Sequence, residues 1–321
     1  MHRARTVRPP AAKVRSVKGV DWGAVDRLVA QAPGPEAIMH HRLGVFAAHR
    51  LRQQGRPVPE RYQEEERLAA LAAMTARPTL ERVLAHAGEP LLLVKGPELA
   101  RHYPPETPKP YRDLDLVALD APAVQRRLLA AGAEPVRDEP IRPDLHHEAP
   151  IVFPGLPMVV EVHRSLKWPD WAAPPPAAGL FERAAPAAGD ERLLVLPAAD
   201  HAVLAAAHAW AHLPLRRILD LLDVAVLLGS GPGTKVSATA LAHKWGVQRL
   251  WGTSLAAVEA LFEGAPRPWP LRSWARDLPA ARERTAVETA LSRWLSPAAC
   301  RPPARALRAG GGALRRDLRP R

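Results

Sequence analysis

Two aspartates, Asp113 and Asp115, have the spacing in this chain that most directly indicates chemistry, and they lie in the run RDLDLV at 112–117. Side chains alternate along a β-strand, so both carboxylates point to one face, about 7 Å apart. Two like charges at that spacing repel each other unless water or a cation separates them, and carboxylate oxygens favour Mg²⁺ or Mn²⁺. Together with Glu161, the pair predicts a divalent-metal site for phosphoryl chemistry. The alternatives are a solvated strand end for the aspartates and a structural ion pair with an arginine for Glu161.

A turn with the sequence Lys95-Gly96-Pro97 follows an apolar strand and precedes a short helical segment. Glycine lets the backbone approach a phosphate closely, and a helix N-terminus adds a favourable dipole. Lys95 supplies a full positive charge, although a solvated loop lysine is an equally ordinary explanation. Lys109 and Arg112 are further candidates, because charge that develops on a phosphate requires nearby cations. We therefore expect Lys95, Gly96, Lys109 and Arg112 to bind a nucleotide.

Apolar periodicity predicts the elements that position these residues. Helices are expected at 21–31, 37–54, 60–76, 80–86, 97–102 and 121–131, and a further helical region from 198 to about 262. Strands are expected at 91–94, 114–119, 151–153 and 158–163. The expected fold class is α/β (α+β), with a small mixed sheet at its core. A chain of 321 residues exceeds what one hydrophobic core usually organises, so several subdomains are expected.

Composition limits the classes of partner. The formal net charge of +12 comes from the two ends, because residues 21–300 are close to neutral. Basic tails at 1–20 and 299–321, expected to be disordered, therefore leave a nucleic-acid partner possible but not favoured. The one cysteine, Cys300, excludes an intrachain disulfide and fits a reducing cytosol. We find no apolar signal-peptide segment and no uninterrupted membrane span, and we expect a cytoplasmic protein without membrane contact.

Four blocks of the sequence, in this order and at this spacing, together resemble a known family. They are LLLVKGPELARHY, RDLDLVALD, VVEVHRSL and HAWAHLPLRRILDLLDVAVLL. The chain resembles, over roughly residues 35–260, a poorly characterised bacterial nucleotidyltransferase family of the DNA polymerase β-like superfamily. The resemblance implies a small mixed sheet with flanking helices. It also implies that Asp113, Asp115 and Glu161 hold two Mg²⁺ ions while the Lys95-Gly96 turn approaches the triphosphate.

The chain departs from the superfamily pattern at three places. Lys95-Gly96 replaces the common Gly-Ser turn and so lacks a hydroxyl that binds phosphate. Arg112 stands where a small polar residue is commoner, and its guanidinium is positioned in the sequence to pair with Asp113 when metal is absent. Arg164 replaces a frequent aromatic residue, which puts nucleotide stacking there in doubt.

Several histidines lie near these blocks. His163 shares the face of Glu161, and we expect it to orient a carboxylate or the acceptor without binding the metal itself, or to have a structural role. His208 and His212 share one face of a helix, but the glutamate of a zinc-protease helix and a cysteine cluster are both missing, so a zinc site is not favoured. These histidines are expected to line a cleft between subdomains, on the acceptor side, or to be satisfied within a core. On the following turns, Arg216 is expected to reach a phosphate with Asp220 as its orienting partner, or the two form an ordinary i, i+4 pair.

Six segments are expected along the chain. They are a basic tail at 1–20, a helical N-terminal subdomain at 21–87, a nucleotidyltransferase core at 88–171, a Pro-rich linker at 172–190, a helical C-terminal subdomain at 191–298 and a basic tail at 299–321.

The leading functional hypothesis is transfer of a nucleoside monophosphate, AMP by preference, from an NTP such as ATP to an unidentified acceptor. Mg²⁺ or Mn²⁺ is the expected cofactor. The first alternative is a non-catalytic nucleotide-binding or antitoxin-like regulatory module. The second is a protein that binds nucleic acid through its basic tails.

Overall fold

The computed structural model describes residues 20–136, 146–187 and 190–298. The two basic tails, apart from Val20, and Cys300 lie outside these residues. The helices are α1 (Trp22–Gln31), α2 (Pro35–His40), α3 (Gly44–Gln53), α4 (Glu60–Ala87), α5 (Pro97–Ala100), α6 (Ala121–Ala130), α7 (Ala177–Phe181), α8 (Ala198–His212), α9 (Ile218–Leu228), α10 (Thr234–Lys244), α11 (Gln248–Phe262), α12 (Trp269–Trp274), the 3₁₀ helix η1 (Leu278–Ala280) and α13 (Ala286–Ala298). The strands are β1 (Leu91–Leu93), β2 (Asp113–Val117), β3 (Glu134–Pro135), β4 (Ile151–Phe153), β5 (Leu156–His163), β6 (Ala185–Ala187) and β7 (Asp190–Val195).

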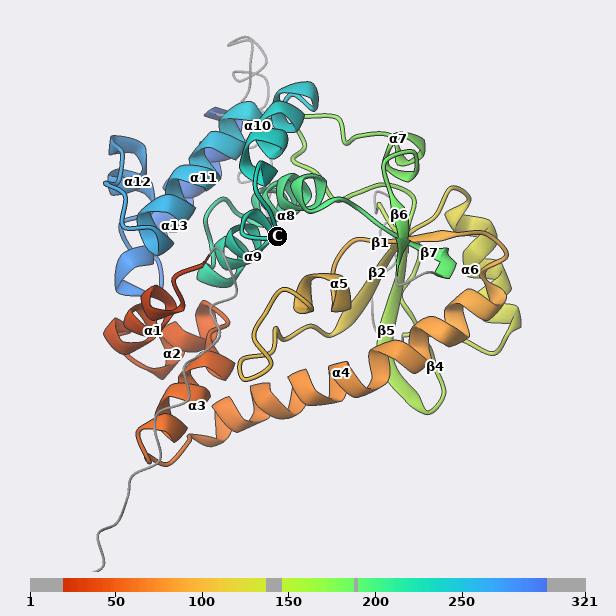
Figure 1. Ribbon diagram of the computed structural model, residues 1–321, viewed down its shortest axis with the longest axis horizontal. Helices are drawn as coiled ribbons and strands as arrows, with labels where there is room; N and C mark the ends of the chain where they lie inside the picture. The colour runs from red at the N-terminus through yellow and green to blue at the C-terminus, as the bar shows by residue number, and fades with distance from the viewer. Residues whose placement is uncertain (1–19, 137–145, 188–189, 299–321) are drawn as a thin grey trace, which may run out of the picture.

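One mixed sheet forms the centre of the fold, in the order β3-β4-β5-β2-β1-β7-β6. β2 pairs in parallel with β5 and antiparallel with β1, while β1 pairs in parallel with β7. The helices α1–α3 and α8–α13 gather on the left of Figure 1, and the sheet lies on the right. The expected fold class, a mixed sheet with flanking helices, is confirmed.

Alternation along the strands divides the apolar core between the two faces of the sheet. Leu114 and Leu116 of β2 pack with residues of α4 and α6 in one cluster. Val117, two positions beyond Asp115, packs with α8 and α9 in the other cluster. Because Asp113 and Asp115 share the parity of Val117, their side chains belong to the α8 face.

Helix α4 differs from the expectation of two helices separated at Pro78. The structure contains one helix of 28 residues with Pro78 inside it. A proline removes one backbone hydrogen bond, but Ala76 and Leu80 on either side of it are buried, and the Thr79 hydroxyl donates to the Thr75 carbonyl at 2.7 Å. Packing therefore outweighs the local preference, and α4 runs from α3 to the outer face of the sheet (Figure 1).

Two further segments differ from expectation. The single helix expected at 37–54 is divided into α2 and α3, because Arg42 between them adopts a positive φ of 57°. The segment expected to be a linker, 172–190, contains α7 and β6 and ends at the first residue of β7. β7 begins with exposed charged residues, so its apolar pattern is short, yet it pairs with β1.

Among the residues that the structure describes, no helix has both the length and the apolar character needed to cross a membrane.

His41 connects three parts of the fold. Its Nδ1 accepts a hydrogen bond from the Ile218 amide at 3.3 Å, so Nε2 carries the proton and donates to the Arg282 carbonyl at 3.0 Å. Burial lowers the pKa of His41 to about 4, and the side chain is neutral at neutral pH. Protonation would replace an acceptor with a donor facing the Ile218 amide.

We expect the free energy of unfolding to fall as the pH decreases from about 6.5 to about 4. In that interval the unfolded chain binds a proton on His41 that the folded chain does not, which costs about 1.4 kcal/mol per pH unit. Urea unfolding at several pH values measures this slope. His41→Gln should reduce the slope by up to one proton, whereas His86→Gln, at an exposed site on α4, should leave it unchanged. Equal slopes for His41→Gln and the wild type would contradict the assignment.

Candidate active site on the α8 face of the sheet

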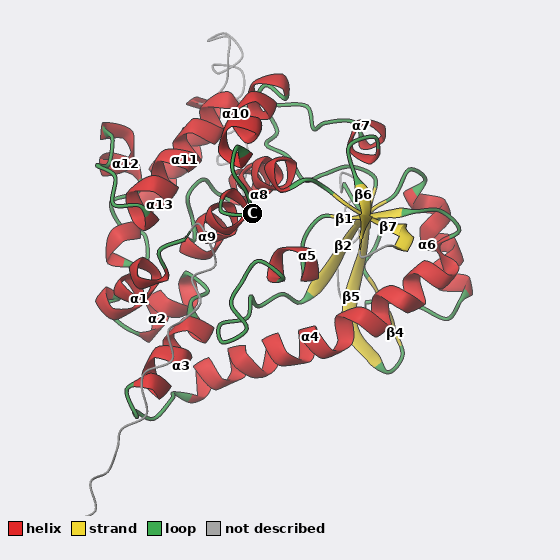
Figure 2. Cartoon of the chain, in the orientation of Figure 1, coloured by secondary structure: helices red, strands yellow, loops and turns green. Residues whose placement is uncertain are grey.

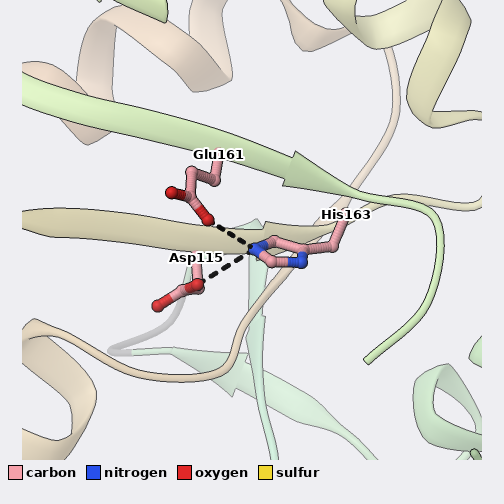
Figure 3. A group of neighbouring side chains, drawn as sticks. All are labelled: Asp115, Glu161 and His163. Atoms are coloured by element: carbon pink, nitrogen blue, oxygen red, sulfur yellow. Dashed lines mark hydrogen bonds and ion pairs between the residues drawn. The ribbon is translucent and has the colours of Figure 1, made fainter. Parts of the chain in front are cut away.

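The pairing register of β2 and β5 brings two acidic positions together. The strands run in parallel with Asp115 opposite Glu161 and Val117 opposite His163. Leu114 of β2, and Val160 and Val162 of β5, point to the other face and pack beneath α4 and α6. Asp115, Glu161 and His163 therefore lie on the same face of the sheet (Figure 3). This face is directed toward α8, because Asp115 and His163 line one pocket with His208 of that helix.

These three side chains make direct contacts. His163 Nε2 lies 2.9 Å from Asp115 Oδ1 and 3.4 Å from Glu161 Oε2 (Figure 3). One donor atom from each of the three residues lies within 4.8 Å of the others. Asp115 is 2% exposed, and its second oxygen, Oδ2, is buried without a hydrogen-bond partner among the described residues. A buried carboxylate oxygen without a partner is unfavourable, so the donor set and this oxygen fit a cation.

The charges of the three groups depend on one another. Burial opposes ionisation of Asp115, but Lys95 and then His163 hold the pKa of this carboxyl far below its usual value. Burial also opposes protonation of His163, yet its hydrogen bonds to Asp115 and Glu161 raise the pKa of the imidazole. Against the effect of burial, the hydrogen bond from His163 lowers the pKa of Glu161. In the metal-free protein, a proton on His163 thus compensates part of the negative charge.

Asp113 lies at the edge of this group. It begins β2 opposite Val159, is half-buried, and does not belong to the three-residue set within 4.8 Å. Burial, followed by the charge of Asp115, raises the pKa of its carboxyl. Of the three expected metal ligands, Asp113 is the one whose carboxyl has a raised pKa, whereas the pKa values of Asp115 and Glu161 are lowered.

The Lys95-Gly96 turn reaches the same place from β1. Lys95 Nζ donates to His208 Nε2 at 2.8 Å and to Asp115 Oδ1 at 3.3 Å. Gly96 has φ +60° and ψ −122°, and a Cβ atom there would lie 3.0 Å from the Asp113 carbonyl oxygen. Glycine is required because the turn presses against β2 in a conformation that other residues rarely adopt. The helix after it, α5, has only four residues, where a helix to residue 102 was expected.

Lys109 and Arg112 were expected to bind nucleotide and have other partners in the structure. Lys109 is 8% exposed, and its Nζ lies 2.8 Å from the carboxylate of Asp223 on α9. Arg112 is largely exposed, and its guanidinium lies 3.4 Å from the carboxylate of Glu65 on α4 instead of pairing with Asp113 as expected. The basic groups of Lys109 and Arg112 are therefore paired with Asp223 and Glu65, and not with the carboxylates of the expected metal site.

A pocket of about 550 Å³, including its open mouth, lies between the sheet and the helices α8 and α9. Its polar lining consists of Lys95, Asp115, His163, Lys167, His208, Asp220 and Asp223. Its apolar lining consists of Val94, Leu99, Leu166, Leu204, Ala205 and Ala209. His208 and Asp220, predicted from helical spacing, are thus near the carboxylates. Burial raises the pKa of Asp220 and lowers the pKa of His208 well below its usual value.

His212 and Arg216 lie beyond the residues that line the pocket. His212 stacks edge-on against His208 with ring centres 4.7 Å apart, and its Nδ1 accepts a hydrogen bond from Lys167 at 3.1 Å. Burial, then the charge of Lys167, lowers the pKa of His212 to about 4. Arg216 follows α8 and is half-buried.

Sequence reasoning did not identify Lys167, Arg42 or the pair His146 and His147. The charges of Lys95 and Lys167 act on one another, and burial lowers the pKa of Lys167. Arg42 acts on Asp113 from the turn between α2 and α3. The rings of His146 and His147 both lie 5.2 Å from that of His163. Of these residues, only Lys167 could have been found from the sequence, because it follows the strand that carries Glu161 and His163 by four residues.

Comparison with known proteins gives one match. The family model described as an uncharacterised nucleotidyltransferase matches residues 36–263, which is well over half of the chain. Neither the curated proteins nor the solved structures contain a match.

Proposed function

This chain belongs to that uncharacterised nucleotidyltransferase family, and on that premise we propose that it transfers a nucleoside monophosphate from an NTP to an acceptor. ATP is the preferred donor and AMP the group transferred, and the acceptor is a hydroxyl or phosphate on a small molecule, peptide or protein. The observation that carries the proposal is the register that places Asp115 beside Glu161, with Asp113 two residues away on the same face, at a pocket lined by lysine.

A divalent ion, Mg²⁺ or Mn²⁺, fits the carboxylates. The buried, unpartnered Asp115 Oδ2 and the donors within 4.8 Å support this assignment. Such an ion would neutralise phosphate charge and lower the pKa of an acceptor hydroxyl. Asp115 and Glu161 would hold it, and Asp113 would complete the set from the open end of β2.

The transfer reaction consists of one displacement at phosphorus, and side chains of this protein accept the proton and offset the phosphate charge. The acceptor oxygen forms a bond to the α-phosphorus, the bond from that phosphorus to the β-phosphate oxygen breaks, and pyrophosphate leaves. The proton of a hydroxyl acceptor passes to Asp113, the carboxylate at the open end of β2. Lys95 and Lys167, both lining the pocket, offset the charge of the departing phosphates. His208 orients Lys95 by accepting one of its hydrogen bonds.

The test is transfer of label from each of the four α-³²P-labelled NTPs, with Mg²⁺ or Mn²⁺ and a lysate of the host as the source of acceptor. We expect labelled product with the wild type and none with Asp113→Ala. Transfer would identify the base preference and the class of acceptor. Binding of NTPs without transfer from any of them would instead favour the non-catalytic module.

Lys95→Ala is expected to weaken ATP binding about ten- to a hundredfold, because one charge-assisted hydrogen bond contributes about 1.5–3 kcal/mol. Isothermal titration calorimetry in the presence of Mg²⁺ measures the affinity. Lys235→Ala is the matched control, because this lysine pairs with Glu259 on α11 and does not line the pocket. Equal ATP affinity for Lys95→Ala and the wild type would make Lys95 a loop residue without a binding role.

A further inference from the structure

One imidazole nitrogen lies among the carboxylate oxygens of the active site. The three-residue donor set consists of Asp115 on β2 with Glu161 and His163 on β5. We propose that these three residues bind a first-row transition-metal ion, with Nε2 of His163 as a direct ligand, so that the site takes Mn²⁺ in preference to Mg²⁺. This inference rests on the proposed function, because it specifies the ion of the same site.

The spacing of the donors matches a coordination sphere. Ligands about 2.1 Å from an ion and at right angles to each other lie about 3.0 Å apart. His163 Nε2 lies 2.9 Å from Asp115 Oδ1 and 3.4 Å from Glu161 Oε2. The distance from the nitrogen to each of these two oxygens is therefore close to that between ligands on adjacent corners of an octahedron.

The surroundings hold these donors in place. Asp115 and His163 are 2% and 3% exposed, and the parallel register of β2 and β5 determines the separation of their backbones. Asp115 Oδ2 is buried with no hydrogen-bond partner among the described residues, so the carboxylate retains an oxygen available to an ion. His147 Nε2 lies farther from Glu161 Oε2, at 3.9 Å, and its Nδ1 is hydrogen-bonded to the Glu148 carbonyl.

The chemistry of the set decides between ions. Mg²⁺ takes oxygen ligands almost exclusively, whereas imidazole suits transition metals and carboxylate suits Mn²⁺ as well. Asp113, which would make the set oxygen-only, does not belong to the tight group. One nitrogen and two oxygens from the protein leave three octahedral positions for oxygens of the nucleotide, the acceptor or Asp113.

Electron spin-echo spectroscopy of the Mn²⁺-loaded protein tests the direct bond. We expect ¹⁴N modulation from a bound imidazole in the wild type, its loss in His163→Gln and its retention in His147→Gln, the matched control. Competition titrations should show Mn²⁺ binding more tightly than Mg²⁺, and His163→Gln should weaken Mn²⁺ at least about tenfold while changing Mg²⁺ less. Protein grown with ¹⁵N-histidine should show ¹⁵N in place of ¹⁴N coupling, which tests the bond even where the variant does not fold.

Two results would overturn the inference: bound Mn²⁺ without histidine nitrogen coupling, or coupling that persists in His163→Gln and disappears in His147→Gln. Its failure is distinguishable from that of the proposed function. Label transfer by a protein without nitrogen coupling would remove the ligand assignment and retain the nucleotidyl transfer. Nitrogen coupling without any label transfer would support the metal site and remove the proposed reaction.

Discussion

Asp115→Asn is expected to lower metal-dependent nucleotidyl transfer by about 10³-fold or more. The change preserves shape but removes the charge of the carboxylate that contacts both Lys95 and His163. Loss of one metal ligand forfeits several kcal/mol of transition-state stabilisation, and each 1.4 kcal/mol changes the rate about tenfold. Initial rates of label transfer at saturating NTP measure the effect.

The control for this variant is Asp190→Asn, the same substitution at a partly exposed aspartate that begins β7 in the same sheet and pairs with Arg192. It should retain the wild-type rate. Circular dichroism should show that both variants are folded. An Asp115→Asn protein that turns over within tenfold of the wild type would remove Asp115 from the reaction and, with it, the proposed mechanism.

Lys109→Met is expected to lower the free energy of unfolding by about 3–5 kcal/mol, because it leaves the buried carboxylate of Asp223 without its cation. The side chains of Lys109 and Asp223 are only 9% and 11% exposed, and Asp223 also accepts a hydrogen bond from the Tyr103 hydroxyl at 2.6 Å. Urea unfolding at neutral pH measures the loss.

The double variant Lys109→Met with Asp223→Leu supplies the comparison. Removing both charges should recover part of the stability, since the main cost in the single variant is an unpaired buried charge. The ATP affinity of folded Lys109→Met should change less than that of Lys95→Ala. If Lys109→Met lost less than about 1 kcal/mol of stability and its ATP affinity fell strongly, Lys109 would be a nucleotide-binding residue, as its place in the sequence indicated.

The sequence predicted which basic side chains lie near the carboxylates along the chain, but it did not predict which of them would face those carboxylates. Lys95 follows a strand directly, so its place at the end of β1 follows from local structure. Lys109 and Arg112 lie in a Pro-rich loop, where no periodicity determines direction, and their partners, Asp223 and Glu65, are distant in the sequence. The partner of Lys167, His212, is also distant in the sequence, so this contact cannot be inferred from residue spacing either.

Tertiary packing also outweighed local sequence preferences in helix α4 and strand β7. Pro78 is a helix breaker by local preference, but α4 continues through it because buried residues on both sides pack against the sheet. Strand β7 has a weak apolar pattern, yet β1 provides a partner edge for it. Both outcomes depend on contacts that form only when distant segments meet.

What the sequence by itself determined is the presence of a mixed sheet, the positions of its main strands along the chain, and the common face of Asp113 with Asp115 and of Glu161 with His163. Covalent geometry alternates side chains along any strand, so these features need no knowledge of a partner. The tertiary structure alone decided that Asp115 lies opposite Glu161, that His163 stands between their oxygens, and which lysines face them. Strand register and loop paths result from packing between segments distant in the chain, and local periodicity carries no information about them.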